Sequence, residues 1–166
     1  MSPLLSQEFD ISKDALPLQL QSDSCQQTED FGAALARAYL QEPHALPPYI
    51  ALRGDLGVGK TAFVRGFVRE TSPRSAVRSP TFALVNEYRS QTAQYPNVFH
   101  FDMYRITDED DLYSIGYDDY LDRGICIVEW SENIPYALPQ TYLVLSIEKI
   151  SPEQPDSRIL TLSFKN

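Results

Sequence analysis

Hydrophobic residues change their spacing along the chain, and each spacing predicts one kind of element. Near the start, Leu16, Leu18 and Leu20 alternate with other residues, which predicts a first β-strand. After a turn, apolar residues recur at helical spacing, so we predict a helix that Thr28 caps and that runs to about Leu40. The chain is therefore expected to open with a strand followed by a helix.

The segment before this strand has a different character, since it holds two prolines, several polar residues and only weak periodicity. We interpret residues 1–17 as an N-terminal extension that is partly mobile, and residues 18–166 as one domain. A chain of 166 residues is large enough to bury a core of its own.

Further apolar segments predict the rest of a sheet. The continuous runs at residues 49–52 and 125–130 predict buried strands. Two pairs of alternating segments predict antiparallel hairpins, namely 83–88 with 98–102 and 141–147 with 158–164. The link in the first pair is too short for the crossover helix that parallel strands would need. Helices are expected after residue 60, at 107–113 behind a capping box that begins at Thr107, and at 117–121.

The most specific motif lies between a predicted strand and a predicted helix, which is the setting that a phosphate-binding loop requires. The pattern G-x-x-x-x-G-K-[ST] is matched without a mismatch by Gly54-Asp55-Leu56-Gly57-Val58-Gly59-Lys60-Thr61. The glycines allow a tight turn that brings backbone N–H groups against phosphate oxygens, and the helix adds the positive end of its dipole. Lys60 can reach the β- and γ-phosphates, and the Thr61 hydroxyl can ligate Mg²⁺.

Two acidic residues come directly after apolar strand residues, Asp102 after the segment 98–101 and Glu129 after 125–128. In an α/β sheet the ligand site lies at the carboxyl ends of the strands, and Mg²⁺ bound to phosphates takes one or two carboxylates. Either residue could hold Mg²⁺ directly or through water, while the other positions the attacking water.

Composition narrows the class of protein. The formal net charge of −9 argues against broad nucleic-acid binding by this chain alone. Basic residues predominate from Arg53 to Arg89, and this half could bind phosphates or a partner protein. Acidic residues predominate from Asp102 to Glu132, and this half could bind metal and a basic partner. Both halves are equally consistent with an ordinary solvated surface. The two cysteines form neither a disulfide framework nor a metal spacing. With no signal peptide and no apolar stretch of about 20 residues, we expect a cytoplasmic protein.

Four motifs in this order resemble the TsaE (YjeE) family, the small bacterial ATPases of the tRNA threonylcarbamoyladenosine pathway. Besides the phosphate loop, they are Ser79-Pro80-Thr81-Phe82, His100-Phe101-Asp102-Met103-Tyr104-Arg105 and Val128-Glu129-Trp130. The resemblance spans roughly residues 18–164. It implies an α/β fold, a three-layer P-loop NTPase with a mixed central sheet flanked by helices, and it implies ATP or ADP with Mg²⁺.

The resemblance also implies roles for individual residues. Thr61 and Glu129 would contact the metal, and Asp102 would be needed for hydrolysis. Thr81 lies in a segment that resembles a nucleotide-sensing switch, and with Lys60 and Asp102 it completes the expected catalytic set. The expected nucleotide contacts are the loop residues Asp55, Leu56, Gly57, Val58, Gly59, Lys60 and Thr61, together with Thr28, Trp130 and Arg158. At the last of these positions the sequence departs from the family pattern, because Ser157-Arg158 stands where the family usually has Gly-Arg.

Members of this family act with protein partners, which the resemblance implies here too. The partners are a carbamoyltransferase-type catalytic subunit and its paralogous dimer partner, and ATP hydrolysis supports their repeated turnover. An acidic ATPase without an obvious RNA surface would then reach tRNA only through this complex.

Two other enzyme classes and a binding module share the phosphate loop. A small-molecule kinase needs an arginine-rich lid, which Arg74 and Arg78 could imitate. A regulatory GTPase should carry an Asn-Lys-x-Asp base-reading motif, and the sequence has none. A pure nucleotide-binding module would not need the paired acids Asp102 and Glu129.

Overall fold

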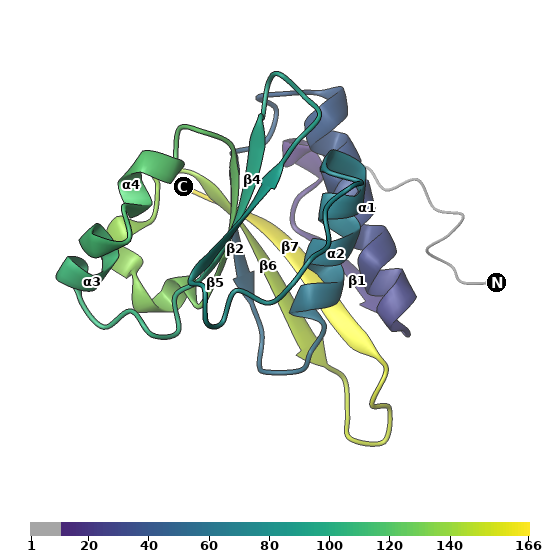
Figure 1. Cartoon of the computed structure of the whole chain (residues 1–166). Helices are drawn as coiled ribbons and strands as arrows, with labels where there is room; N and C mark the ends of the chain where they lie inside the picture. Colours follow the sequence, from purple (N-terminus) through teal and green to yellow (C-terminus); the bar gives the residue numbers. More distant parts are fainter. Residues whose placement is uncertain (1–10) are drawn as a thin grey trace.

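The computed structural model describes residues 11–166, and a mixed seven-stranded sheet forms the centre of this part of the chain (Figure 1). The strand order is β1-β7-β6-β2-β5-β4-β3. The strands are β1 (Leu18–Ser22), β2 (Tyr49–Arg53), β3 (Val85–Arg89), β4 (Asn97–Asp102), β5 (Ile125–Glu129), β6 (Tyr142–Lys149) and β7 (Arg158–Lys165).

The four central strands β6, β2, β5 and β4 are parallel, and antiparallel strands complete both edges. Both predicted hairpins are confirmed, because β3 pairs antiparallel with β4 and β6 pairs antiparallel with β7. The apolar runs that predicted buried strands are β2 and β5, which lie side by side in the middle of the sheet. The predicted α/β class with a mixed sheet is therefore confirmed.

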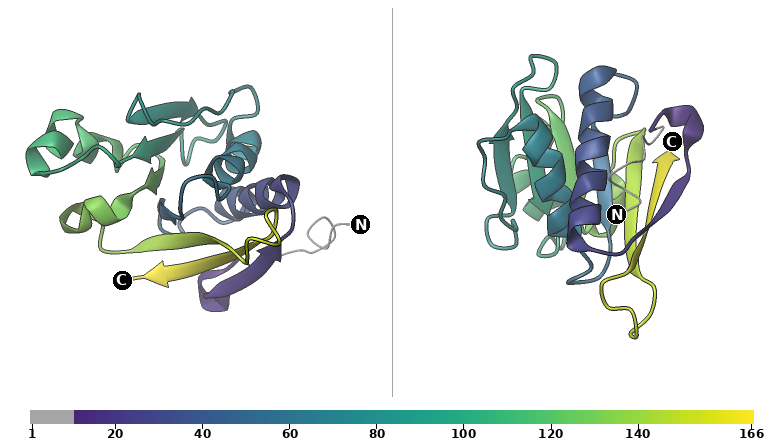
Figure 2. Two further views of the ribbon diagram at one scale, coloured as in Figure 1. Left: turned by 90° about the horizontal axis from the view of Figure 1, so that it is seen from below. Right: turned by 90° about the vertical axis from the view of Figure 1, so that its right-hand side faces the viewer.

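Helices cover both faces of the sheet (Figure 1). They are α1 (Cys25–Gln41), α2 (Lys60–Thr71), α3 (Glu109–Ser114) and α4 (Tyr117–Tyr120), with short 3-10 helices at Lys13–Ala15, Ser131–Asn133 and Pro135–Ala137. The right view of Figure 2 shows α1 and α2 side by side in front of the sheet, while α3 and α4 lie on the other side in Figure 1. Within residues 11–166, no helix has both the length and the apolarity that crossing a membrane requires.

Two glycines allow α1 and α2 to pack closely. A Cβ atom at Gly32 would lie 2.1 Å from the Phe63 carbonyl oxygen, and one at Gly66 would lie 1.8 Å from the Glu29 carbonyl oxygen. Both distances are shorter than any real contact, so the two backbones approach each other where no side chain intervenes. This packing fixes α2, and therefore the loop before it, against the rest of the fold.

Two predicted helix starts are wrong by a few residues. The side chain of Ser24, not Thr28, caps α1 by accepting a hydrogen bond from the Gln27 amide at 3.1 Å, and Thr28 lies inside the first turns. In α3 the cap is Asp108, whose carboxylate accepts from the Asp111 amide at 2.8 Å. In each case a neighbouring residue offers an equally good side-chain oxygen, so sequence alone does not choose between them.

The N-terminal segment is described from residue 11 onward. Ile11 is buried in the core, and the Lys13 ammonium lies 4.3 Å from the centre of the Phe164 ring. Residues 1–10, the larger part of the predicted extension, lie outside the described residues. The division of the chain at residue 18 stays a prediction.

Candidate functional site

The phosphate-binding motif forms the loop between β2 and α2, at the carboxyl ends of the parallel strands (Figure 1). This is the strand–loop–helix arrangement that the sequence predicted. Gly59 is the N-cap of α2 and has a left-handed backbone, with φ 112°. Gly57 also has positive φ, and a Cβ there would meet no atom within 4 Å, so the loop faces open space at this point.

The start of the loop is held tightly against the sheet. A Cβ at Gly54 would lie 2.6 Å from the Ile147 carbonyl oxygen on β6 and 2.7 Å from the Val58 side chain. Glycine is therefore required at this position, where φ is also positive. Val58 is buried while Leu56 is 90% exposed, so one side of the loop packs on the protein and its tip projects outward.

Lys60 is buried beneath this loop and contacts three groups. Its Nζ donates a hydrogen bond to the Gly54 carbonyl at 2.6 Å and lies 3.7 Å from Oε1 of Glu129. It also lies 5.1 Å from the centre of the Trp130 ring. The first residue of α2 and the last residue of β5 thus meet as a buried ion pair, with an aromatic face beside the ammonium.

Asp102 and Glu129 end neighbouring strands and are paired in register across β4 and β5. Both are buried. The Tyr104 amide donates to Oδ1 of Asp102 at 2.9 Å, and the Met103 amide donates to the Glu129 carbonyl, also at 2.9 Å. The two acidic residues that sequence reasoning selected therefore end adjacent strands, with their side chains on the same face of the sheet.

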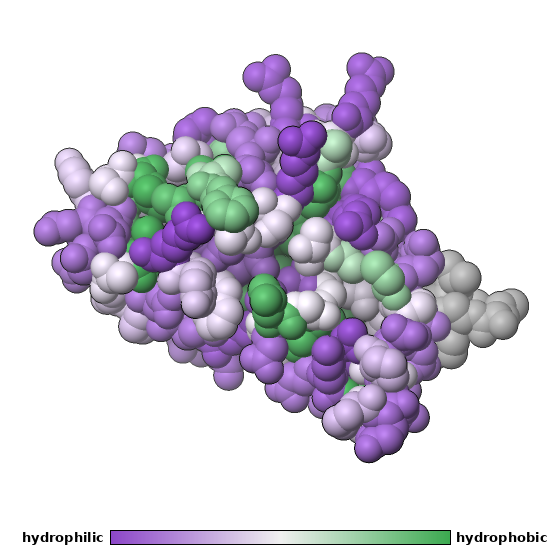
Figure 3. Space-filling model, turned by 60° about the horizontal axis from the view of Figure 1, so that its bottom comes forward, coloured by the Kyte–Doolittle hydropathy of each residue, from purple (hydrophilic) through white to green (hydrophobic). Residues whose placement is uncertain are grey.

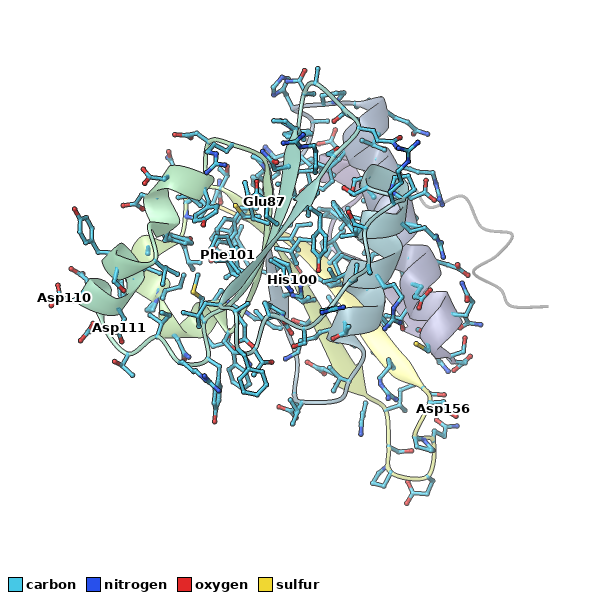
Figure 4. The ribbon with its side chains drawn as sticks, in the orientation of Figure 1. Glu87, His100, Phe101, Asp110, Asp111 and Asp156 are labelled. Carbon is cyan, nitrogen blue, oxygen red and sulfur yellow. The ribbon has the colours of Figure 1, made fainter. Side chains whose placement is uncertain are left out.

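His100 is a site residue to which the sequence analysis gave no role. It is fully buried, and its Nε2 lies 2.8 Å from Oε2 of Glu129. Figure 4 labels His100 and Phe101, which alternate on β4: Phe101 packs in the cluster of α3 and α4, and His100 lies on the side of α2. The signal for it was available, because a strand residue two positions before Asp102 must share its face.

Two residues expected at the nucleotide do lie against the loop. Arg158 donates from Nε to the Val58 carbonyl at 2.8 Å and also contacts the carbonyls of Pro155 and Ser157. Thr28 is buried, and its methyl group would lie 3.7 Å from a Cβ at Gly59. Each reaches the loop from another part of the chain, Arg158 from β7 and Thr28 from α1.

The segment that contains Thr81 lies between α2 and β3. The Thr81 and Ser79 hydroxyls are 2.8 Å apart and share a hydrogen bond. Phe82 is 84% exposed, with the Arg105 guanidinium 5.1 Å from its ring centre. In the part of the chain that the structure describes, no hydrogen bond joins residues 79–82 to the phosphate loop.

Side-chain oxygens on the elements around Lys60 are of the kind that coordinate Mg²⁺ when it is also bound to phosphate. Thr61 follows Lys60 directly in the first turn of α2. Glu129 ends β5, the neighbour of β2 in the sheet, and Asp102 ends β4, the next strand after β5. Among residues 11–166 there is no group of three or more His, Cys, Asp or Glu residues that could hold a metal alone. This donor set suits a metal that shares its coordination with phosphate oxygens and water.

The surface around the strand ends is mostly hydrophilic, with separate hydrophobic patches (Figure 3). The exposed large hydrophobic side chains include Leu56 on the loop, Phe82 and Tyr104. Tyr104 packs its ring at 5.2 Å, centre to centre, against Trp130. Two aromatic rings therefore extend from the buried Lys60 to the surface, first Trp130 and then the exposed Tyr104.

Known proteins resemble this chain in both sequence and structure. The sequence model of the family described as threonylcarbamoyl adenosine biosynthesis protein TsaE matches residues 22–159. A tRNA threonylcarbamoyladenosine biosynthesis protein TsaE from Haemophilus influenzae is 34% identical over 119 residues, which are 71% of this chain and 73% of that protein. The protein of the same name from Bacillus subtilis is 36% identical over 106 residues, 63% of this chain and 64% of its own length.

The fold agrees with a solved structure of a similar protein. The crystal structure of Bacillus subtilis YdiB superposes with a TM-score of 0.63 and 27% sequence identity, covering 87% of this chain and 83% of that one. The family model covers most of the described residues, including the phosphate loop, Asp102 and Glu129. The chain therefore belongs to the TsaE family of threonylcarbamoyl adenosine biosynthesis proteins.

Proposed function

We propose that this protein binds ATP with Mg²⁺ and hydrolyses it to ADP and phosphate in support of threonylcarbamoyladenosine modification of tRNA. The observation that carries the proposal is the meeting of Lys60 and Glu129, 3.7 Å apart, beneath a complete phosphate-binding loop. A lysine for the β- and γ-phosphates and a carboxylate for the metal side are the two charges that such a site needs.

The loop residues would bind the phosphates. Lys60 now donates to the Gly54 carbonyl, and a phosphate oxygen is a stronger acceptor because it is charged. The open space in front of Gly57 leaves room for that phosphate. Thr61 and Glu129 would hold Mg²⁺, which when bound neutralises charge that develops on the phosphates.

Asp102 is the residue that we assign to the attacking water. Its side chain is buried on the same face of the sheet as that of Glu129, at the end of the neighbouring strand, and its Oδ1 accepts a hydrogen bond from the Tyr104 amide. Its other oxygen, Oδ2, would accept a hydrogen bond from the water and orient it toward the terminal phosphate. The Thr81 hydroxyl, which is bonded to that of Ser79, would have to exchange this partner to contact the terminal phosphate.

We further propose that the protein works in the cytoplasm through a pair of protein partners and does not itself modify tRNA. The family name gives the pathway, and the chain's net charge of −9 disfavours direct binding to the RNA backbone. The partners would be the carbamoyltransferase-type catalytic subunit and its paralogous dimer partner. ATP hydrolysis would then allow repeated turnover of that pair.

Phosphate release is the direct test of this function. The purified chain is mixed with ATP and Mg²⁺, with and without the purified partner pair, and tRNA modification is followed in parallel. We expect phosphate release that rises with the partners, and modification that stops when this chain is left out. Transfer of the γ-phosphate to a small-molecule acceptor, or a preference for GTP, would instead support a kinase or a GTPase.

A further inference from the structure

We infer that His100 is a positioning residue for the metal side of this site, acting through Glu129. This inference rests on the proposed function, since it assigns the metal contact to Glu129. Three observations carry it: the burial of His100, the hydrogen bond between its ring and one oxygen of Glu129, and the different contact made by the other oxygen.

The Glu129 carboxylate is held by different partners at its two oxygens. Oε2 lies 2.8 Å from Nε2 of His100, and Oε1 lies 3.7 Å from Nζ of Lys60. A carboxylate held at one oxygen cannot rotate freely about its last bond. His100 therefore directs Oε1 toward the phosphate loop, where the lysine and the expected metal lie.

The surroundings of His100 determine which ring nitrogen carries the hydrogen. His100 is fully buried, and its Nδ1 has no hydrogen-bond partner among the described residues. An ionised carboxylate oxygen can only accept a hydrogen bond, so the ring nitrogen that faces Glu129 must be the donor. A hydrogen is therefore assigned to Nε2, which donates to Glu129.

The backbone explains why this contact is rigid. His100 and Glu129 lie on adjacent parallel strands, and His100 is two residues before Asp102, the register partner of Glu129. The contact therefore runs diagonally between neighbouring strands, from His100 to the residue two positions beyond its own register partner, Ile127, and both side chains lie on the same face of the sheet. An imidazole in this place can orient Glu129 without reaching solvent or the nucleotide itself.

Metal sites commonly depend on such supporting groups. Residues that hydrogen-bond a metal ligand, without touching the metal, typically change metal affinity by about 10- to 100-fold when they are removed. We therefore expect His100→Leu to weaken Mg²⁺ binding to the ADP complex by about 10- to 100-fold. ADP binding in EDTA should stay near that of the unchanged protein, because Lys60 and the loop are untouched.

The test is a calorimetric titration of Mg²⁺ into the ADP complex, with ADP affinity in EDTA measured in parallel. His100→Gln serves as the conservative variant, because its amide N–H reaches about as far as Nε2, and it should restore most of the Mg²⁺ affinity. Phe99→Leu is the matched control. It alters a buried residue one position away on the opposite face of β4, so it should lower stability without changing Mg²⁺ affinity.

A double variant separates positioning from packing. If His100 acts through Glu129, His100→Leu combined with Glu129→Gln should bind Mg²⁺ no more weakly than Glu129→Gln alone. Unchanged Mg²⁺ affinity in His100→Leu, or an additive loss in the double variant, would overturn the inference while leaving the proposed function intact.

If His100→Leu does not fold, equal Mg²⁺ affinities in His100→Gln and the shorter His100→Asn would overturn the inference. Absence of any ADP binding by the unchanged protein would instead defeat the proposed function.

Discussion

Asp102 and Glu129 are the last residues of adjacent parallel strands, and they stand opposite each other in register. Their contacts nevertheless differ. Glu129 is held by His100 and lies near Lys60, whereas Oδ1 of Asp102 is bound by the Tyr104 amide. Two neighbouring carboxylates with different partners are suited to different tasks.

This difference predicts opposite effects for the two amide substitutions. Glu129→Gln should weaken Mg²⁺-dependent nucleotide binding by about tenfold or more, because it removes a charged ligand. Asp102→Asn should leave ATP binding near normal and lower turnover by on the order of 10², as loss of a water-orienting group does. Titration with and without Mg²⁺ measures the first effect, and phosphate release with the partner pair measures the second. The reverse pattern would mean that the two roles are exchanged.

The segment 79–82 should respond to the γ-phosphate. The Ser79 and Thr81 hydroxyls are bonded to each other, and the described residues show no hydrogen bond from this segment to the phosphate loop, so both hydroxyls can exchange partners when a nucleotide binds. We expect slower amide hydrogen exchange there with a non-hydrolysable ATP analogue than with ADP. Residues 125–129, a buried central strand, provide the internal control and should exchange equally in both states. Equal protection of 79–82 in the two states would rule out a nucleotide-sensing role.

Arg158 should support the phosphate loop from β7. Its Nε bonds the Val58 carbonyl, so Arg158→Ala removes one hydrogen bond to the loop backbone. A net hydrogen-bond contribution of about 0.5–1.5 kcal/mol corresponds to a two- to tenfold weaker affinity for ATP. Fluorescence of Trp130, the single tryptophan in the chain, can follow the titration because its ring lies 5.1 Å from Lys60. Unchanged ATP affinity would show that Arg158 does not shape the loop.

Much of this arrangement could be predicted from the sequence, and the reason is local. A complete phosphate-loop motif that follows an apolar run predicts a strand before the loop and a helix after it. Four apolar residues before Glu129 predict a buried strand that ends at this residue. The contact of Arg158 with Val58 could not be predicted in the same way. It depends on the order of strands in the sheet, since the two residues lie 100 positions apart in the sequence.

The pairing of His100 with Glu129 was missed for a related reason. Alternation along β4 places His100 on the face of Asp102, but only the register between β4 and β5 brings Glu129 within reach. The wrong helix cap has a different cause. Ser24 and Thr28 both carry a hydroxyl near the start of α1, and the choice depends on where the chain leaves β1.

Close packing of α1 on α2 makes a stability prediction. Gly66→Ala would place a methyl group 1.8 Å from the Glu29 carbonyl oxygen, so the helices must separate. We expect the free energy of unfolding to fall by about 1–3 kcal/mol or more, as overpacking does. Arg65→Ala, one residue away, is the control, because it removes an ion pair with Glu29 whose arginine is half exposed and adds no atom between the helices, so it should cost at most about 1 kcal/mol. Urea denaturation measures both, and equal losses would contradict the packing account.

Binding of ATP by the Lys60→Ala variant tests the central claim most directly. The buried Lys60 ammonium lies between the loop carbonyl of Gly54 and the carboxylate of Glu129, where the β- and γ-phosphates are expected. Calorimetric titration with ATP and Mg²⁺ compares the unchanged protein, Lys60→Ala and Lys149→Ala, which removes the same charge at an exposed position. We predict that Lys60→Ala stays folded, binds ATP at least about tenfold more weakly and releases no phosphate, while Lys149→Ala behaves normally. Unchanged ATP affinity and turnover in a folded Lys60→Ala variant would contradict the assignment of this loop as the nucleotide site.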